Sequence, residues 1–259
     1  MKSKIIAIIN EKGGVAKTTT AFTLACGLTS KGYKVLALDL DAQTNLTSTF
    51  KGAQTKTDKN IVKVLTGEIK ASEAIQKLEQ ADIIASSKGL AGIDAKLTET
   101  GKEYKLKEAL EHIRSFYDFI IIDTAPALSI LTINALTACD YAIIPVKADL
   151  YSLQGMEQLR QTIKAIKKYT NNSLLVAGVL LNHYNARSPQ ERELKGYFDE
   201  LAKTLNTKVY KAKIRTANAL FKKSIAQQES IFKIDAKHGA TQDYNDFINE
   251  LLEDLKKGK

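Results

Sequence analysis

The stretch 11–20 (EKGGVAKTTT) constrains the fold of this chain more than any other part of the sequence. It follows the apolar run 4–10 (KIIAIIN) and precedes Ala21, Leu24 and Leu28, which recur at helical spacing. This order predicts a strand, a glycine turn and a helix. Paired glycines let backbone amides approach an anion closely, and the following helix directs free N–H groups and its positive dipole end to the same place. The stretch therefore predicts a phosphate-binding loop.

We predict a chemical role for two side chains of this loop. Lys17 reaches the terminal phosphate oxygens, and the Thr18 hydroxyl completes the coordination of a Mg²⁺ ion. The loop departs from G-x-x-x-x-G-K-[ST], because Glu11 and Ala16 stand where glycines belong. We expect φ at Ala16 to be negative, since alanine tolerates positive φ poorly. The alternative is a glycine turn in an ordinary strand–helix unit, with Lys12 and Lys17 solvated.

Length and composition fit one large α/β domain. The chain has 259 residues, of which 44% are hydrophobic, and this is enough for a sizeable core. No apolar run is long enough for a membrane-spanning helix, and the run 4–10 lacks a signal-peptide cleavage site, so we expect a cytoplasmic protein. Cys26 and Cys139 lie in apolar segments without neighbouring His or Cys ligands, and we interpret them as buried thiols.

The formal net charge of +9 is unevenly distributed. Residues 201–240 hold nine Lys or Arg against two acids, a net charge of +7. A concentrated basic region is typical of a nucleic-acid-binding surface. The solvated face of a basic protein explains the charge equally well, so charge alone leaves both interpretations open.

Acidic residues follow two further apolar runs. The run 34–40 (KVLALDL) leads through Asp39 to Asp41, and the run 119–122 (FIII) ends at Asp123. Because the carboxyl ends of parallel strands gather around the ligand crevice of an open sheet, we expect these acids beside the phosphate loop. There they can bind Mg²⁺ through water or activate an attacking water. Taken alone, Asp41 could instead cap the next segment.

The rest of the chain alternates apolar runs with amphipathic segments. Its tail, 244–255, repeats apolar residues at helical spacing with an acidic opposite side, whereas a membrane-surface helix prefers a basic side. We therefore predict that the tail closes the core. No proline-rich or serine-rich linker divides the chain, which predicts a single domain over residues 1–259. Helices are expected at 61–67, 106–114, 128–138, 152–168 and 191–205, and strands at 81–85, 141–146, 174–181 and 209–210.

Three motifs in order resemble the deviant Walker A ATPases of the ParA/MinD family (SIMIBI class). The loop resembles K-G-G-x-x-K-T-T, DLDAQTNLT resembles D-x-D-P-Q, and DTAPALSILTINAL resembles D-x-P-P-x-x-x-x-L-T-x-N-A-L. The resemblance covers nearly the whole chain. It implies a single P-loop NTPase domain, with a mostly parallel twisted sheet flanked by helices on both faces, and ATP and Mg²⁺ as cofactors.

The resemblance implies catalytic roles for three residues. Lys12 reaches across the interface of an ATP-dependent sandwich dimer to the nucleotide of the other subunit. Lys17 binds the terminal phosphates, and Asp41 activates the attacking water. Ala42 replaces the usual proline after Asp41, so this turn is expected to be less rigid.

Metal and nucleotide ligands follow from the same motifs. Thr18 binds Mg²⁺, Asp123 binds it through water, and Asp39 is a further water-mediated candidate. Asn182 corresponds to an asparagine near adenine in the family, although a simple turn residue is nearly as good an explanation. The nucleotide-binding candidates are Lys12, Gly13, Gly14, Val15, Ala16, Lys17, Thr18, Thr19 and Asn182.

The basic region of the chain also resembles the DNA-binding part of this family. Arg187 matches the arginine of the Y-D-A-R-T motif, which contributes to non-specific DNA binding in chromosomal members, although Asn185 and Pro189 depart from it. Basic residues without interleaved exposed aromatics predict salt-dependent, sequence-indifferent contact with the duplex backbone. The DNA-binding candidates are Arg187, Lys211, Lys213, Arg215, Lys222 and Lys223.

The implied function is plasmid or chromosome partition by a slow ATPase. It would bind non-specific double-stranded DNA in the bacterial nucleoid and be stimulated by a centromere-binding, ParB-like partner, without a membrane. No N-terminal helix-turn-helix domain is expected, because the first strand begins at about Lys4. Two alternatives stay open: a MinD-like spatial regulator that acts at a membrane, and a nucleotide switch that does not hydrolyse ATP.

Overall fold

A computed structural model describes residues 3–258 of the chain. Within them, seven strands form one sheet in the order β3-β4-β2-β5-β1-β6-β7. All neighbouring pairs are parallel except β3 with β4. The predicted fold class is confirmed. The strands are β1 (Lys4–Ile8), β2 (Val35–Leu40), β3 (Ile75–Gln76), β4 (Asp82–Ile84), β5 (Phe119–Thr124), β6 (Tyr141–Lys147) and β7 (Leu175–Asn182).

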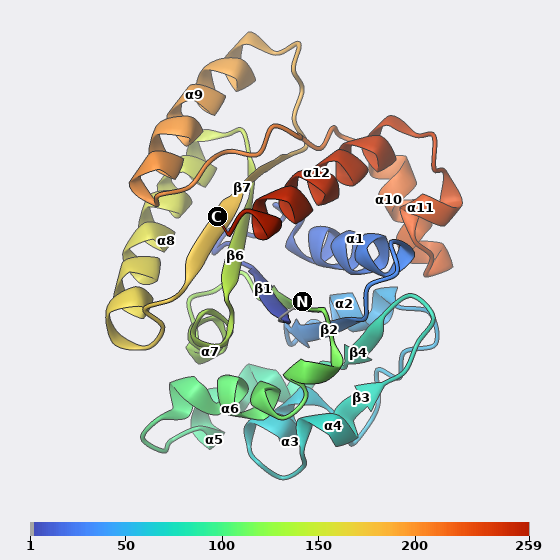
Figure 1. Cartoon of the computed structure of the whole chain (residues 1–259), viewed down its shortest axis with the longest axis vertical. Helices are drawn as coiled ribbons and strands as arrows, with labels where there is room; N and C mark the ends of the chain where they lie inside the picture. The colour runs from blue at the N-terminus through green and yellow to red at the C-terminus, as the bar shows by residue number, and fades with distance from the viewer. Residues whose placement is uncertain (1–2, 259) are drawn as a thin grey trace.

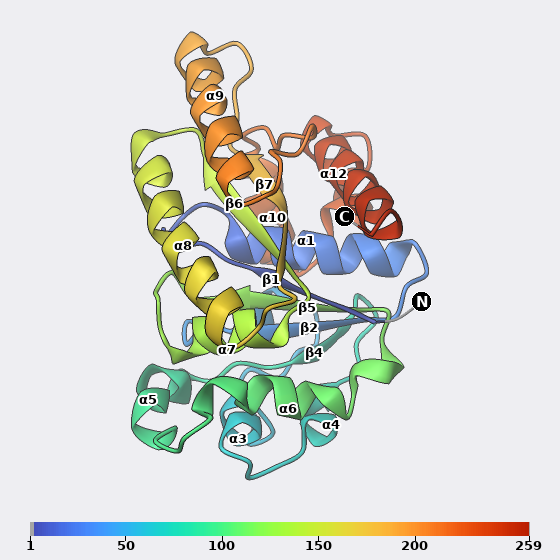
Figure 2. The same cartoon turned by 60° about the vertical axis from the view of Figure 1, so that its left-hand side comes forward.

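Helices cover both faces of this sheet (Figures 1 and 2). On one face lie α1 and α12, with α10 and α11 beside them, and on the other lie α3, α6, α7 and α8. The helices are α1 (Lys17–Ser30), α2 (Asn45–Thr49), α3 (Ile61–Leu65), α4 (Ala71–Ala74), α5 (Ile93–Lys96), α6 (Lys105–Glu111), α7 (Ile130–Ala138), α8 (Leu150–Tyr169), α9 (Pro189–Thr204), α10 (Asn218–Gln227), α11 (Ile231–Ile234) and α12 (Gly239–Lys256).

The alternation of side chains along β1 explains why there are two cores. Ile5 and Ala7 pack into the core beneath α3, α6, α7 and α8, whereas Ile6 and Ile8 pack into the core beneath α1 and α12. Successive residues of a strand point to opposite faces of the sheet. A strand buried on both faces therefore needs a continuous apolar run, and KIIAI is one.

Helix α12 confirms the prediction for the tail. Tyr244, Phe247 and Leu251 are fully buried, and the helix packs against α1 (Figure 1). Within residues 3–258, no helix combines the length and the apolar character needed to cross a lipid bilayer. Cys26 and Cys139 are buried free thiols, as predicted.

Most predicted element boundaries agree with the structure within two residues, and the short elements are the exceptions. The predicted strand at 209–210 is wrong: Val209 forms only an isolated bridge with Val179. Helices α2, α5, α10 and α11 and strand β3 were absent from the prediction. All of these helices except α10 have five residues or fewer, too few for a helical period to repeat.

Candidate nucleotide-binding site

The phosphate loop lies where three neighbouring strands end. It connects β1 to α1, and β1 pairs with β5 on one side and with β6 on the other. The loops that follow β5 and β6 therefore flank it. This is the position that open α/β sheets use for ligands.

The backbone of Ala16 corrects one expectation. Its φ is 70° and its ψ is 34°, which is left-handed, and Ala16 is the N-cap of α1. Its carbonyl oxygen accepts a hydrogen bond from Thr20 N at 2.9 Å, the first turn of the helix. The expected negative φ is wrong because the turn, with Gly14 also at a φ of 71°, sets the backbone conformation in spite of the alanine Cβ. Such a conformation costs a residue with a Cβ about 1–2 kcal/mol.

Ala16→Gly is therefore expected to stabilise the nucleotide-free protein by about 1 kcal/mol. Glycine removes the left-handed strain, and its greater freedom in the unfolded chain offsets part of the gain. Urea unfolding measures the difference.

Gly14→Ala is the matched control for that prediction. A Cβ at Gly14 would meet nothing closer than Lys147 Nζ at 4.0 Å, so backbone strain is the main change. The control should destabilise the protein by about 1 kcal/mol or more. Destabilisation by Ala16→Gly would contradict the assigned strain.

Lys17 folds back over its own loop. Its Nζ donates a hydrogen bond to the Lys12 carbonyl oxygen at 2.9 Å, and the residue is 93% buried, with 7% exposed. Burial lowers the pKa of Lys17, while the charges of Asp123 and Asp41 oppose this effect. The ammonium group is thus held beside both acids, as the sequence predicts.

Asp123 is a buried acid without a protein partner. It is fully buried at the end of β5, next to Ile8 of β1 and Asp39 of β2. Neither carboxylate oxygen accepts a hydrogen bond within residues 3–258. Burial raises its pKa well above the ordinary value and the charge of Asp39 raises it further, while the Thr18 hydroxyl and the charge of Lys17 oppose the shift. Buried polar groups normally have partners, so these oxygens and the Thr18 hydroxyl fit a site for Mg²⁺.

Asp39 differs from Asp123 because its oxygens are already occupied. They accept hydrogen bonds from Asp41 N at 3.0 Å, Thr47 N at 2.8 Å and Thr47 Oγ1 at 2.7 Å. Burial raises the pKa of Asp39 to about 6, and the hydrogen bonds from Thr47 oppose the shift. These contacts support a role in positioning the turn that carries Asp41 more strongly than the predicted contact with metal through water.

Asp41 lies in a turn that the protein braces without proline. Its Oδ1 accepts a hydrogen bond from Gln43 N at 2.9 Å, and its carbonyl oxygen accepts one from Ser86 Oγ at 2.5 Å. The side chain is mostly buried, with the residue 8% exposed. Ser86 N in turn donates to Thr47 Oγ1 at 3.0 Å. This network supplies rigidity that Ala42 does not.

Lys12 is held by an acid that the sequence analysis missed. Its Nζ donates to Asp149 Oδ1 at 2.6 Å and Oδ2 at 2.7 Å, and to Ser152 Oγ at 3.3 Å. Asp149 also caps α8 by accepting from Ser152 N at 2.8 Å. Partial burial raises the pKa of Asp149, but the bonds from Lys12 and Ser152 N outweigh it and hold the pKa below its ordinary value. The signal was present, since Asp149 follows an apolar strand just as Asp41 and Asp123 do.

Asn182 lines a cavity beside the loop. Its Nδ2 donates to Val15 O at 3.2 Å, while its Oδ1 is buried without a partner among residues 3–258. The cavity measures about 190 Å³ and is also bordered by Ala16, Thr19 and Phe221. A free amide oxygen there can accept a hydrogen bond from the exocyclic amino group of a base.

The DNA-binding candidates are not equivalent in the structure. The Arg215 guanidinium donates two hydrogen bonds to Asp243 of α12, at 2.7 and 2.8 Å, and the Arg215 backbone N donates a third at 3.0 Å. Lys222 and Lys223 on α10 are exposed, and no ion pair within residues 3–258 involves either. Lys213 lies over the Tyr184 ring, 5.7 Å from its centroid. Arg187 and Lys211 are exposed in the segments on either side of α9.

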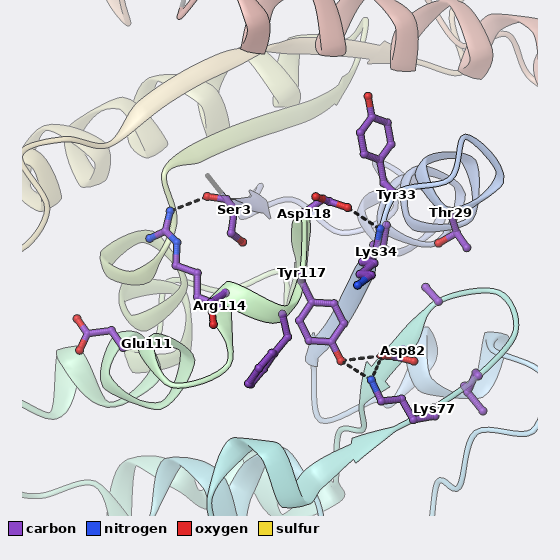
Figure 3. Close-up of a pocket in the computed structure, with 15 residues that line it drawn as sticks. Ser3, Thr29, Tyr33, Lys34, Lys77, Asp82, Glu111, Arg114, Tyr117 and Asp118 are labelled. Carbon is purple, nitrogen blue, oxygen red and sulfur yellow. Dashed lines mark hydrogen bonds and ion pairs between the residues drawn. The ribbon is translucent and has the colours of Figure 1, made fainter. Parts of the chain in front are cut away.

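A larger cavity, of about 1060 Å³, lies at the opposite end of the sheet (Figure 3). It borders the amino ends of β2 and β5, and none of the predicted site residues lines it. Some of its polar side chains contact one another: Tyr117 OH donates to Asp82 Oδ2 at 2.6 Å, and Lys77 contacts both (Figure 3). Ser3 Oγ, Thr29 Oγ1 and Arg114 Nε are buried without a partner among residues 3–258. We nevertheless place the nucleotide at the phosphate loop, because the Lys17 ammonium and the buried carboxylates lie there.

Comparisons with known proteins find relatives over most of this chain. A family described as AAA domain matches residues 3–176. The chain is 36% identical to the sporulation initiation inhibitor protein Soj of Bacillus subtilis (strain 168), over 96% of this chain and 98% of that protein.

Two solved structures with nucleotides are also similar. One, named cobyrinic acid a,c-diamide synthase from Mycobacterium smegmatis, holds an ATP analogue and magnesium; its identity is 31%, with a TM-score of 0.83, over 99% of this chain and 97% of that one. The other, a plasmid partition protein of Borrelia burgdorferi B31 described as putative, is bound to AMPPNP; its identity is 26%, with a TM-score of 0.79, over the whole of both chains.

Proposed function

The chain belongs to the AAA domain family and, within it, to the ParA-type P-loop ATPases, and on this premise we propose that it is an ATP-hydrolysing DNA-partition protein. ATP and Mg²⁺ are its cofactors. One observation supports hydrolysis best: the buried, unpartnered carboxylate of Asp123 lies beside Lys17 and near Asp41 at the mouth of the loop. A loop that only bound nucleotide could use Asp123 for the metal, but it would not need Asp41 in a turn that hydrogen bonds hold in place.

The site residues divide the chemistry between them. When bound, Mg²⁺ neutralises the negative charge that develops on the phosphates. Thr18 and Asp123 hold the metal, Asp123 through water, and Lys17 binds the terminal phosphate. Asp41 orients and deprotonates the attacking water, while Asp39 and Ser86 keep its turn in place. Asn182 accepts a hydrogen bond from the base.

The cellular cycle is proposed from the same residues. With ATP, two subunits form a sandwich dimer in which Lys12 leaves Asp149 and reaches the nucleotide of the partner. The dimer binds non-specific double-stranded DNA through exposed lysines and arginines, and is therefore nucleoid-associated in the bacterial cytoplasm. A centromere-binding protein stimulates the slow hydrolysis and releases the DNA. ATP binding favours dimerisation, and dimerisation therefore favours ATP binding to the same extent.

DNA retention with ATP, with ADP and without nucleotide, at one fixed salt concentration, tests this proposal. Retention only with ATP, together with phosphate release that is lost in Asp41→Ala, is the expected result. Recruitment to anionic vesicles with ATP, without retention on DNA, would favour the membrane-acting alternative. Phosphate release equal in the wild type and Asp41→Ala would favour the non-hydrolysing switch.

The double variant Lys222→Glu/Lys223→Glu is expected to lose at least about tenfold in DNA affinity. The slope of log affinity against log salt should fall by about 2, since each lysine lost from a phosphate removes about one released counterion. Lys222 also borders the cavity beside Asn182, so nucleotide affinity is measured separately and DNA affinity is compared at saturating ATP.

The control for this prediction is Lys164→Glu/Lys168→Glu. Both lysines are exposed near the end of α8 and the charge change is identical. The control should change DNA affinity less and leave the slope nearly unaltered. Equal losses in the two double variants would mean that only net charge matters, and α10 would not be the contact.

A further inference from the structure

A third lysine lies at the phosphate loop besides Lys12 and Lys17. Lys147 is the last residue of β6, and its Nζ would lie 4.0 Å from a Cβ placed on Gly14. The loop motif does not include this lysine, because it follows a different strand much later in the sequence. Only the fold brings it to the loop.

The register of β6 places this side chain on the face of the sheet that carries the loop and α1. Ile143 of β6 packs into the core beneath α1 and α12, whereas Val146 packs into the opposite core. Because side chains alternate along a strand, Lys147 lies on the same face as Ile143. It is paired with Asn182 of β7, whose side chain also faces the loop by donating to Val15 O at 3.2 Å.

The three lysines at the loop differ in their partners. The Lys12 ammonium pairs with Asp149 at 2.6 Å, and Lys17 Nζ donates to the Lys12 carbonyl oxygen at 2.9 Å. Among residues 3–258, the Lys147 ammonium has no ion-pair partner and donates no hydrogen bond, although the residue is partly buried. Burial of a charge without a partner is unfavourable, so an anion bound at the loop would supply what Lys147 lacks.

The charge of Lys147 also acts on the segment that follows β7. Burial lowers the pKa of His183, and the charge of Lys147 lowers it further. His183 directly follows Asn182, and both residues border the cavity beside the loop. The Lys147 ammonium therefore lies near both the loop, which suits phosphates, and the cavity in which Asn182 can bind a base.

Negative charge exceeds positive charge among the site groups assigned above. The phosphates of ATP carry more charge than Mg²⁺ and Lys17 neutralise, and the carboxylate of Asp41 adds more. We propose that Lys147 binds the phosphate chain of the nucleotide held by its own subunit; this proposal rests on the proposed function and adds a residue to its nucleotide site. Unlike Lys12, Lys147 acts without a second subunit. A hydrogen bond from an ammonium group to a phosphate oxygen increases affinity about tenfold or more.

The test measures the affinity for fluorescently labelled ADP and for a non-hydrolysable ATP analogue, with Mg²⁺ and at low protein concentration. Lys147→Gln is expected to bind both about tenfold more weakly than the wild type, and the difference should shrink as the salt concentration rises. Lys147→Arg keeps the charge and should retain most of the affinity. Lys31→Gln is the control, because Lys31 is exposed at the other end of α1, and it should bind like the wild type. Thermal unfolding without nucleotide confirms that all variants fold.

The possible outcomes separate this inference from the proposed function. Unchanged affinity in Lys147→Gln overturns the inference alone. Equal losses in Lys147→Gln and Lys147→Arg also overturn it, because the shape of the lysine and not its charge would then matter. A wild-type protein that binds neither nucleotide overturns both the inference and the proposed function. Weaker binding in Lys147→Gln, in a protein that neither hydrolyses ATP nor retains DNA, supports the inference and overturns the proposed function.

Discussion

Asp123→Asn is expected to reduce ATP turnover by at least about 100-fold, and the nucleotide-free variant should lose less stability than the wild type as the pH rises. Both effects have one cause. The carboxylate is fully buried without a protein partner, so it suits a cation and is costly without one. The amide cannot assist the metal, but it carries no charge to bury.

The direction of the pH effect follows from the two raised pKa values. Burial raises the pKa of Asp123 well above its ordinary value and that of Asp39 from 3.8 to about 6. Above pH 4, the native state holds protons that the unfolded chain has released, so the free energy of unfolding falls as the pH rises through this window. For Asp39 alone, the fall up to pH 8 is about 3 kcal/mol. In Asp123→Asn, the contribution of Asp123 to this fall disappears, so the free energy of unfolding depends less on pH.

Phosphate release and urea unfolding at pH 5, 6.5 and 8 check the two effects. Asp94→Asn is the control, because Asp94 is exposed in α5 and far from the loop in sequence, and it should change neither quantity. Normal turnover in Asp123→Asn would remove this acid from the site. A pH dependence of stability parallel to that of the wild type would mean that Asp123 is already ionised in the native protein, so that burial does not raise its pKa.

Lys12→Ala is expected to retain part of the ATP binding while losing ATP-dependent dimerisation and at least about 100-fold in hydrolysis. A charge supplied across an interface to a phosphoryl group can contribute this much or more. Within its own subunit, the Lys12 ammonium makes a partly exposed ion pair with Asp149 and a long hydrogen bond to Ser152 Oγ, and exposed ion pairs of this kind contribute about 0–1 kcal/mol to stability. Unfolding would therefore not explain a loss of this size.

Light scattering and phosphate release with ATP measure these effects, and Lys31→Ala is the control. Lys31 is exposed where α1 ends and should affect neither. A Lys12→Ala dimer of unchanged affinity would show that the lysine does not act across the interface. In that case its contact with Asp149 would be its whole role.

The sequence was most informative where chemistry and secondary structure coincide in a short stretch. The apolar runs before Gly13, Asp41 and Asp123 identified three neighbouring strands, because a strand buried on both faces must be apolar throughout. The carboxyl ends of such strands share one edge, so the acids could be assigned to one site before the structure was known. Short helices such as α2 and α11 could not be found in this way.

The roles of Asp149 and Ser86 could not be predicted from sequence patterns. Each lies far in sequence from the residue that it holds, Lys12 and Asp41 respectively, and only the order of the strands brings them together. The same limit applies to the basic region. Charge counting treated Arg215 and Lys222 alike, but α12 pairs one of them with Asp243.

By itself, the sequence determined the phosphate loop, the parallel sheet and the acids at its carboxyl edge, because each depends on local periodicity and on residue types that few other arrangements use. Only the tertiary structure decided which charges are free and which are paired, and that Ala16 takes a left-handed conformation. These features depend on contacts between segments from 28 to 137 residues apart, or on a backbone angle set by the whole turn. No local pattern in the chain encodes them.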